Sequence, residues 1–376
     1  MSSTRLLERA QYIPAAIILA YALVLGLLTI PAIQRELLFL HHVPIPLFAD
    51  FHHPEKYGLA PFKTRNLRLN TSDGVELGAW HILQDCADQS IGRSRSSYQS
   101  LDPLPPLSPL DDRIFEKALS ERPNILYFHG NAGTRAISHR VRSYSSFSNT
   151  LDCNVLAVDY RGFGDSSGTP SEEGLLEDAR TAFDFVAGIL GKAGLSKDEI
   201  QDQIILAGQS LGTGVVSGLA GRLALEGIFP RALVLIAPFT SITDLLVSYR
   251  LFRFVPILGP LAVFPSIQRY FQTHLHHPFD SVKALENTSS STLILHAVND
   301  NTIPFSHSAK IFSSLRSTIN PSVTVEETIY PGWGTVRTFG RVEKGEVIWW
   351  EGQYGGHDNL GWAEGTTDLI ARIARL

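Results

Sequence analysis

The sequence is poor in cysteine and has no excess of basic residues. Only two cysteines, Cys86 and Cys153, occur among its 376 residues, so a disulfide framework is excluded. Cys153 precedes the apolar run 155–158, and we expect it to pack as a small hydrophobic side chain. The net charge of −5 argues against a nucleic-acid partner. No repeat recurs at a fixed period, so the length predicts one domain of roughly 250–300 residues with additional segments.

One long stretch lacks charge altogether. Residues 12–33 read YIPAAIILAYALVLGLLTIPAI, which is long enough to cross a hydrocarbon core of about 30 Å as a helix. No small-residue cleavage site ends the run, and its length favours a retained anchor over a cleaved signal peptide. Arg5 and Arg9 before it, against Arg35 after it, favour a cytosolic N-terminus. The sequence therefore predicts one transmembrane helix within residues 1–35 and a single-pass membrane protein.

The rest of the chain divides by composition. Residues 36–61 are rich in His, Pro and aromatic residues and predict an irregular juxtamembrane segment, and 62–376 form the folded domain. Residues 91–112 are dense in Ser, Pro and Arg and predict a flexible insertion. Asn70 and Asn287 each begin an Asn-Thr-Ser sequon, which is a glycosylation acceptor if the domain is lumenal.

Periodicity predicts an α/β fold. Residues 65–69 and 75–83 alternate around a Gly-containing turn and indicate a hairpin. From residue 124 onwards, short apolar runs alternate with helical stretches, which indicates a mostly parallel, doubly wound sheet with helices on both faces. The expected strands are 124–128, 155–158, 203–207, 232–236 and 292–296, and the expected helices are 134–148, 173–190 and 211–225.

The interval 240–287 is too long for an ordinary strand connection. It contains LFRFVPILGPLAVFPSIQRYF, an apolar sequence interrupted by Pro256, Pro260 and Pro265. These prolines, with Arg250 at one end, argue against a second membrane span. We expect short helices that form a cap over the carboxyl edge of the sheet.

The motif Gly208-Gln209-Ser210-Leu211-Gly212 follows an expected strand and precedes an expected helix. A G-x-S-x-G pattern is common by chance, but in this context it indicates a sharp turn that presents a nucleophilic serine. The alternative is a glycine-rich helix start packed closely on a strand. The turn and the following helix N-terminus favour Ser210 as the nucleophile.

A serine nucleophile needs a base that is oriented by an acid, and in this arrangement the chain order is Ser, acid, His. Asp300 lies in the loop after the strand 292–296. Of the two histidines beyond it, His307 is too close in sequence, which leaves His357 as the base. The competing acids are Asp244, at the start of the cap, and Asp358, whose position next to the histidine makes the contact difficult.

Negative charge that develops on the substrate needs backbone donors. We expect one from Leu211, directly after the nucleophile. The second is expected from the loop His129-Gly-Asn-Ala-Gly133, with Asn131 as the residue that supplies the amide. The alternative interpretation of this loop is a simple turn.

Other candidate motifs predict no cofactor or metal. Residues 159–168 are glycine-rich but match neither a P-loop nor a dinucleotide fingerprint, so we interpret them as structural. His274, His276 and His277 lack an accompanying carboxylate pattern, and we interpret them as solvated.

Several motifs together resemble the monoacylglycerol and lysophosphatidylserine lipases of the α/β-hydrolase-domain group. They include HGNAGTR at 129–135, DYRGFGDS at 159–166, GQSLGTG at 208–214 and HAVNDNTIPF at 296–305. The resemblance covers roughly 62–312. It implies an α/β-hydrolase fold with a helical cap, a membrane serine hydrolase of the endoplasmic reticulum with a lumenal catalytic domain, and a lipid ester substrate.

The sequence departs from that pattern in two places. Asn299 stands where the family usually has a second acid. Residues 331–353 look like an added hairpin before His357, and we expect it to wall the substrate site with its tryptophans, Trp333, Trp349 and Trp350.

The sequence thus predicts hydrolysis of lipid carboxylic esters, such as monoacylglycerols or lysophospholipids, by Ser210, Asp300 and His357. A serine peptidase of the prolyl-oligopeptidase type shares the fold and the three residues. A non-catalytic membrane scaffold is the third alternative, and the complete set of three argues against it.

Overall fold

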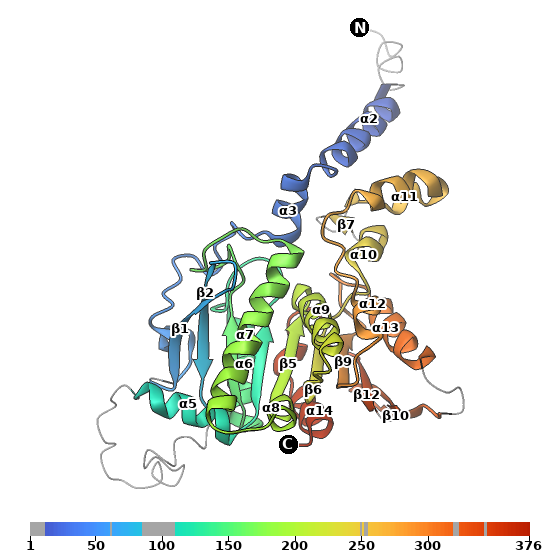
Figure 1. Cartoon of the computed structure of the whole chain (residues 1–376). Helices are drawn as coiled ribbons and strands as arrows, with labels where there is room; N and C mark the ends of the chain where they lie inside the picture. Colours follow the sequence, from blue (N-terminus) through green and yellow to red (C-terminus); the bar gives the residue numbers. More distant parts are fainter. Residues whose placement is uncertain are drawn as a thin grey trace.

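The computed structural model describes residues 12–60, 62–84, 110–248, 250–251, 255–318, 323–341 and 344–376. Figure 1 shows a central sheet flanked by helices, with the N-terminal helix α2 projecting from the end that also carries α10 and α11. The strands are β1 (Thr64–Asn70), β2 (Glu76–Ile82), β3 (Asn124–Phe128), β4 (Asn154–Val158), β5 (Ile204–Gln209), β6 (Ala232–Ile236), β7 (Arg250–Leu251), β8 (Val255–Pro256), β9 (Ser291–Ala297), β10 (Glu326–Tyr330), β11 (Gly334–Arg341) and β12 (Lys344–Gly352). The α-helices are α2 (Tyr12–Leu27), α3 (Pro31–Phe39), α5 (Asp112–Glu121), α6 (Ser138–Thr150), α7 (Glu172–Lys192), α8 (Lys197–Asp202), α9 (Leu211–Leu225), α10 (Ile242–Ser248), α11 (Pro265–Thr273), α12 (Ser281–Leu285), α13 (Ser306–Ser317) and α14 (Glu364–Ala374). The described residues also contain three short 3₁₀ helices, η1 (Pro54–Tyr57), η3 (Gly259–Val263) and η4 (Leu360–Trp362).

Ten strands of the described residues form one sheet in the order β1-β2-β4-β3-β5-β6-β9-β12-β11-β10. In this order the six strands from β4 to β12 run parallel to one another. The pairs β1–β2, β2–β4, β12–β11 and β11–β10 at the two ends are antiparallel. The predicted hairpin and all five predicted parallel strands are confirmed. Loops that follow the parallel strands therefore meet at one edge, where the candidate site lies.

Two apolar cores cover the two faces of the sheet. On one face, the strands pack against α7, α9 and α13 through residues such as Leu175, Val215 and Ile311. On the other, they pack against α6 and α14 through residues such as Tyr144 and Ile370. The doubly wound arrangement predicted from periodicity is confirmed. Cys153 lies in the second core as a buried free thiol.

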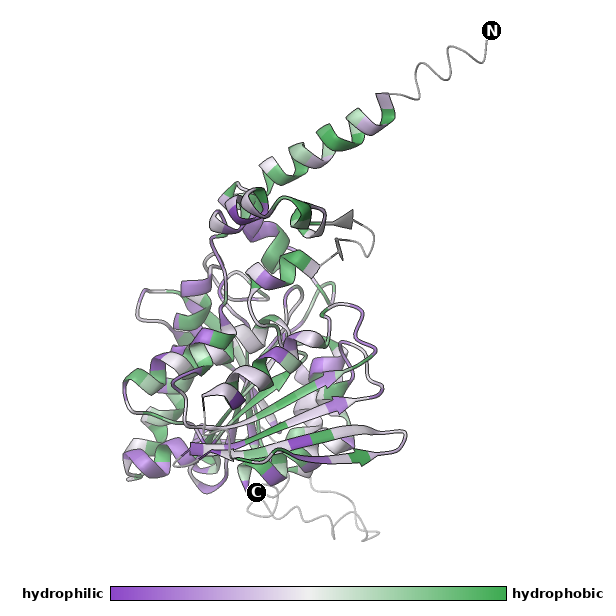
Figure 2. Ribbon diagram, turned by 90° about the vertical axis from the view of Figure 1, so that its right-hand side faces the viewer, coloured by the Kyte–Doolittle hydropathy of each residue, from purple (hydrophilic) through white to green (hydrophobic). Residues whose placement is uncertain are grey.

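The N-terminal apolar stretch differs from the single helix expected over 12–33. It forms α2 and α3, which are bent by 91° relative to each other. No single described helix is long and apolar enough to cross a membrane, whereas this bent pair together has the length and composition of a span. Ile30 has extended backbone angles and Pro31 begins α3. A proline disfavours helical angles at the residue before it, so Pro31 produces the break. Figure 2 shows α2 as a largely apolar ribbon that projects from the body.

The interval 240–287, which we expect to form a cap, contains the short elements α10, η3, α11 and α12. Figure 1 shows α10 and α11 beyond the sheet edge, on the side of α2. The hydroxyl of Tyr21 in α2 donates to the carbonyl oxygen of Ile257 at 2.5 Å, and Leu25 packs with Leu258 and Leu261. In contrast, α12 belongs to the body, because Leu285 lies in the main core. The N-terminal helix and the cap thus contact each other directly.

The stretch 331–353 contains the expected hairpin, formed by β11 and β12, but its tryptophans pack in the cores of the domain. Its second strand, β12, pairs with β9 in parallel and is an integral member of the sheet. Trp349 is buried on one face, where its ring lies 5.3 Å from that of Phe312. Trp350 is buried on the other face and stacks on Trp333 at 4.3 Å. Neighbouring strand residues point to opposite faces, so these tryptophans fill the two cores.

The predicted insertion 91–112 lies outside the described residues except at its end. Asp111 caps α5 by accepting a hydrogen bond from the backbone N–H of Arg113, so the last residues of this stretch start a helix. Cys86 also lies outside the described residues.

We expect Trp349→Ala to lower the free energy of unfolding by about 3–5 kcal/mol, because it removes a large buried ring from the core. Urea unfolding followed by circular dichroism measures the change. Ile329→Ala, on the exposed edge strand β10, is the control and is expected to change stability by less than about 0.5 kcal/mol. Equal losses in the two variants would contradict the assignment of Trp349 to the core.

Candidate active site

Ser210 occupies the turn between β5 and α9 in a strained conformation. Its backbone angles are φ 52° and ψ −119°, which few non-glycine residues adopt. Glycines on both sides make the turn possible: a Cβ on Gly208 would lie 2.3 Å from the Gly212 carbonyl oxygen, and one on Gly212 would lie 2.0 Å from that of Phe128. The backbone N–H of Ser210 donates to Ile236 at 2.9 Å. The turn therefore holds the serine at the carboxyl edge of the sheet.

Asp300 and His357 are brought together at the same edge. Nδ1 of His357 lies 2.8 Å from Oδ2 of Asp300. The other carboxylate oxygen accepts the backbone N–H groups of Thr302 at 2.7 Å and Ile303 at 3.0 Å. This hydrogen bond leaves Nε2 of His357 as the ring nitrogen available to a serine.

The charge of Asp300 is maintained by its neighbours. Burial raises the pKa of this carboxyl, but hydrogen bonds from His296 and His357 outweigh burial and hold the pKa well below its ordinary value. Nε2 of His296, on β9, lies 3.3 Å from Oδ2 of Asp300. An ionised Asp300 can stabilise a positively charged His357, as an acid in this position must.

Two amides fix the loop that carries His357. Nε2 of Gln209 donates to the carbonyl oxygen of His357 at 3.2 Å, which links the loop to the residue next to Ser210. The side-chain oxygen of Asn299 accepts the backbone N–H of Gly356 at 2.9 Å. Asn299 thus helps to position the loop that carries His357, at the place where the lipases that the sequence resembles usually have a second acid.

The two alternative acids make other contacts. Asp244 accepts a hydrogen bond from the Thr240 hydroxyl at 2.8 Å. Asp358 lies 3.3 Å from Nε2 of Gln209 and 3.7 Å from Nε2 of His139. Burial, with Arg140 nearby, lowers the pKa of His139 to about 4, so this imidazole is neutral at physiological pH.

The loop 129–133 lies against the nucleophile. A Cβ on Gly130 would be 3.3 Å from the Cβ of Ser210. The N–H of Leu211 begins α9 and therefore has no acceptor within that helix. No hydrogen bond from the N–H of Asn131 is found within the described part of the chain. The loop that carries Asn131 thus lies beside Ser210, and Leu211 directly follows Ser210 in the chain.

Arg140, on α6, holds this loop from its carbonyl side. Its guanidinium donates to the carbonyl oxygens of three loop residues, Gly130, Asn131 and Ala132, and to that of Thr134 just after the loop, at 2.9–3.2 Å. Arg140 is buried, and an arginine in a helical stretch has no sequence signal that distinguishes it from a surface residue. Sequence reasoning missed it for that reason.

The glycine-rich loop 159–168 is structural, as predicted. Asp159 accepts from the backbone N–H of Arg135 at 2.6 Å and from its guanidinium at 2.5 Å. Arg135 also reaches Asp165 at 2.7 Å, and Nε2 of His129 lies 3.2 Å from Asp159. These buried charges connect the loop to the segment beside Ser210.

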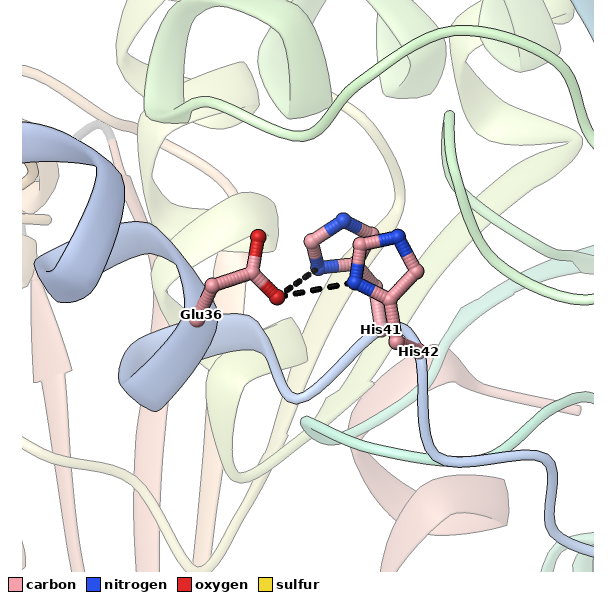
Figure 3. Close-up of side chains that lie close together, drawn as sticks. All are labelled: Glu36, His41 and His42. Atoms are coloured by element: carbon pink, nitrogen blue, oxygen red, sulfur yellow. Dashed lines mark hydrogen bonds and ion pairs between the residues drawn. The ribbon is translucent and has the colours of Figure 1, made fainter.

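One group in the described residues has donors suited to a metal ion. Glu36, His41 and His42 place three ligand atoms within 4.8 Å of one another (Figure 3). His42 Nδ1 lies 2.8 Å from Glu36 Oε2, and His41 Nδ1 lies 3.9 Å from it. Two histidines of the cluster considered from the sequence make protein contacts instead. The backbone N–H of His276 donates to the side chain of Gln34, and Nδ1 of His277 accepts from the backbone N–H of Glu172. The roles assigned to Ser210, Asp300 and His357 require no metal.

A protein-family comparison matches residues 125–342 to the alpha/beta hydrolase family. The chain belongs to this family. Among solved structures, the hydrolase is similar to the esterase Pf2001 of Pyrococcus furiosus, with a TM-score of 0.52 at 13% identity, covering 89% of this chain and 96% of that one. It is also similar to an alpha-beta hydrolase of Vibrio vulnificus, with a TM-score of 0.51 at 17% identity, covering 83% and 79%. At these identities the likeness shows the fold, which is the predicted one.

Curated relatives are similar over most of the hydrolase. The lysophosphatidylserine lipase ABHD12 of Danio rerio is 33% identical over 286 residues, covering 75% of this chain and 66% of that protein. The same lipase of Gallus gallus is 35% identical over 287 residues, with the same coverages of 75% and 66%. The protein ABHD12B of Homo sapiens is 30% identical over 299 residues, covering 78% and 73%. The chain thus spans slightly less than two thirds of the length of these lipases.

We expect Asp300→Asn to lower kcat of the hydrolase by about 10⁴-fold, because an amide stabilises neither the required His357 tautomer nor its charge. Hydrolysis of a short para-nitrophenyl ester measures the effect. Asp358→Asn is the matched control, because it makes the same change at the competing acid next to His357. It is expected to change kcat much less. A larger loss in Asp358→Asn would identify that residue as the acid.

Proposed function

We propose that this chain is a membrane-anchored serine hydrolase that cleaves carboxylic esters of lipids. The observation that carries the proposal is the 2.8 Å contact between His357 and Asp300, at the sheet edge where the strained turn presents Ser210. A nucleophile, a base and an orienting acid are the groups that acyl transfer requires. We assign these roles to Ser210, His357 and Asp300.

In the proposed reaction, His357 accepts the proton of Ser210 as the hydroxyl oxygen attacks the ester carbonyl. The N–H groups of Leu211 and Asn131 stabilise the resulting oxyanion, helped by the N-terminus of α9. His357 then protonates the leaving alcohol, and an acyl-enzyme forms on Ser210. Water activated by His357 releases the fatty acid and restores the serine.

Two apolar surfaces at the same end support a lipid substrate. α2 exposes Ile17, Leu19 and Leu23, and the cap exposes Val263 and Ile267 among others. α2 contains no charged residue and packs against the cap. Exposed apolar side chains that gather on neighbouring elements are typical of a surface that contacts a membrane or a lipid. The relatives named lysophosphatidylserine lipases agree with a monoacylglycerol or lysophospholipid substrate.

Membrane orientation is a further part of the proposal. The bent pair α2–α3 serves as the anchor, and the domain faces the lumen of the endoplasmic reticulum. Both sequon residues, Asn70 and Asn287, are exposed, so they are accessible to glycosylation there.

We expect Ser210→Ala to abolish both labelling by a fluorophosphonate probe and release of fatty acid from monoacylglycerol or lysophosphatidylserine, because the attacking oxygen is gone. Esters of rising chain length and a peptide amide, assayed side by side, separate a lipase from a peptidase. Thr213→Ser in the first turn of α9 keeps a hydroxyl and serves as a control for the helix. Folded wild-type protein that neither labels nor hydrolyses an ester would support the scaffold alternative.

We expect the full chain to remain in the membrane pellet after carbonate extraction of microsomes, and to lose mass on endoglycosidase treatment. The double variant Asn70→Gln/Asn287→Gln removes both acceptors and should show no such mass change. A pellet-bound chain without any glycan shift would contradict the lumenal orientation, and release into the supernatant would contradict the anchor.

A further inference from the structure

We propose that the N-terminal segment 38–45 is a positioning element of the oxyanion hole rather than a passive linker to the membrane. This inference rests on the proposed function. Three loop groups donate to the segment: Asn131 Nδ2 to the Leu38 carbonyl oxygen at 3.3 Å, Ala132 N–H to Phe39 at 2.9 Å and Thr134 N–H to Ile45 at 2.9 Å. These hydrogen bonds involve two of the three loop residues after Gly130, together with Thr134, which directly follows the loop.

The loop needs such contacts because its backbone is strained. Ala132 and Gly133 both have φ of 57°, and the left-handed region is costly for alanine. A Cβ on Gly133 would lie 2.9 Å from the Ile45 carbonyl oxygen, so the segment packs directly on the loop. Arg140 binds the loop carbonyl groups, while the segment binds N–H groups. The peptide group between Asn131 and Ala132 is thus held at both ends: its carbonyl oxygen accepts from Arg140, and its N–H donates to the carbonyl oxygen of Phe39.

The segment is itself fixed to the body. The Phe39 side chain is fully buried, and its ring lies 5.3 Å from His277 and 6.3 Å from Phe279. Gln34, buried on α3, donates to the carbonyl oxygens of Leu28 at 2.7 Å and His274 at 2.8 Å. A displacement of this segment therefore moves the carbonyl groups that hold the loop.

The effect of such a displacement falls on the transition state. A misplaced Asn131 N–H binds the oxyanion poorly but makes no contact needed to bind the ground-state ester, so kcat falls while KM changes little. Loss of one oxyanion donor in other serine hydrolases lowers kcat by about 10²–10³-fold.

The test uses the full chain in detergent and a soluble ester, para-nitrophenyl butyrate. We expect Phe39→Ala to lower kcat by about 10–100-fold and Asn131→Ala by several-fold, with KM within about twofold of wild type. Asn131 is exposed, so its truncation leaves the fold intact. Phe39→Leu retains buried apolar bulk and is expected to recover part of the lost kcat. Active-site titration with a fluorophosphonate corrects each rate for folded enzyme.

Two further measurements separate positioning from general destabilisation. Binding of a trifluoromethyl ketone, whose adduct places an oxyanion in the hole, should weaken in parallel with kcat/KM, whereas inhibition by butyrate should not change. The double variant Phe39→Ala/Asn131→Ala should lose less than the product of the single losses, because both act on one loop.

Phe48→Ala is the matched control. Phe48 belongs to the same N-terminal stretch but is 90% exposed, and its replacement should leave kcat unchanged. If the wild-type chain hydrolyses the ester and kcat of both Phe39→Ala and Asn131→Ala stays within twofold of the wild-type value, this inference is overturned while the proposed function stands. Absence of ester hydrolysis by the wild-type chain would overturn the proposed function, and this inference with it.

Discussion

The first turn of α9 lies against the carboxyl end of β3, so closely that a Cβ on Gly212 would come within 2.0 Å of the Phe128 carbonyl oxygen. This contact places Ser210 beside Gly130, which belongs to the loop that carries the second expected oxyanion donor. Since β5 and β3 are neighbours in the sheet, the geometry follows from strand order. The acid and base then need only reach the same edge, through the loops after β9 and β12.

Charged residues hold the loops where regular structure ends. Arg135, Asp159 and Arg140 are all buried, and each contacts backbone groups or an opposite charge. Burial of such groups is costly unless they are fully paired, and paired groups specify one arrangement of the chain. The conformation of the loops beside Ser210 is therefore fixed by the Arg135–Asp159 ion pair and by the hydrogen bonds from the Arg140 guanidinium to carbonyl oxygens. Apolar packing supplies the sheet and helices below them.

Local patterns in the sequence predicted most of this framework. The parallel strands, the turn at Ser210 and the order of Ser210, Asp300 and His357 all follow from short-range periodicity or chain order. Local patterns could not predict that β12 joins the sheet beside β9, because strand pairing across a long connection depends on tertiary contacts. The break before Pro31 follows from a local signal, because a proline also restricts the residue before it, although hydropathy alone predicts one continuous helix over 12–33.

The contacts of the N-terminal segment illustrate the same limit. Nothing in the sequence of residues 38–45 announces that their carbonyl groups meet a loop almost one hundred residues later, because backbone acceptors are common to all residues. Arg140 and His296 were missed for a related reason: their roles depend on neighbours from other elements. Site residues with a chemical motif are predictable, whereas those that position them become visible only in three dimensions.

The chain order of the proposed nucleophile and the proposed base has a consequence for biosynthesis. His357 follows Ser210 in the sequence and lies after β12, the strand that pairs with β9. The ribosome therefore releases Ser210 before it releases the histidine that is proposed to activate it. A translation product that stops between these two residues carries the serine without its proposed base.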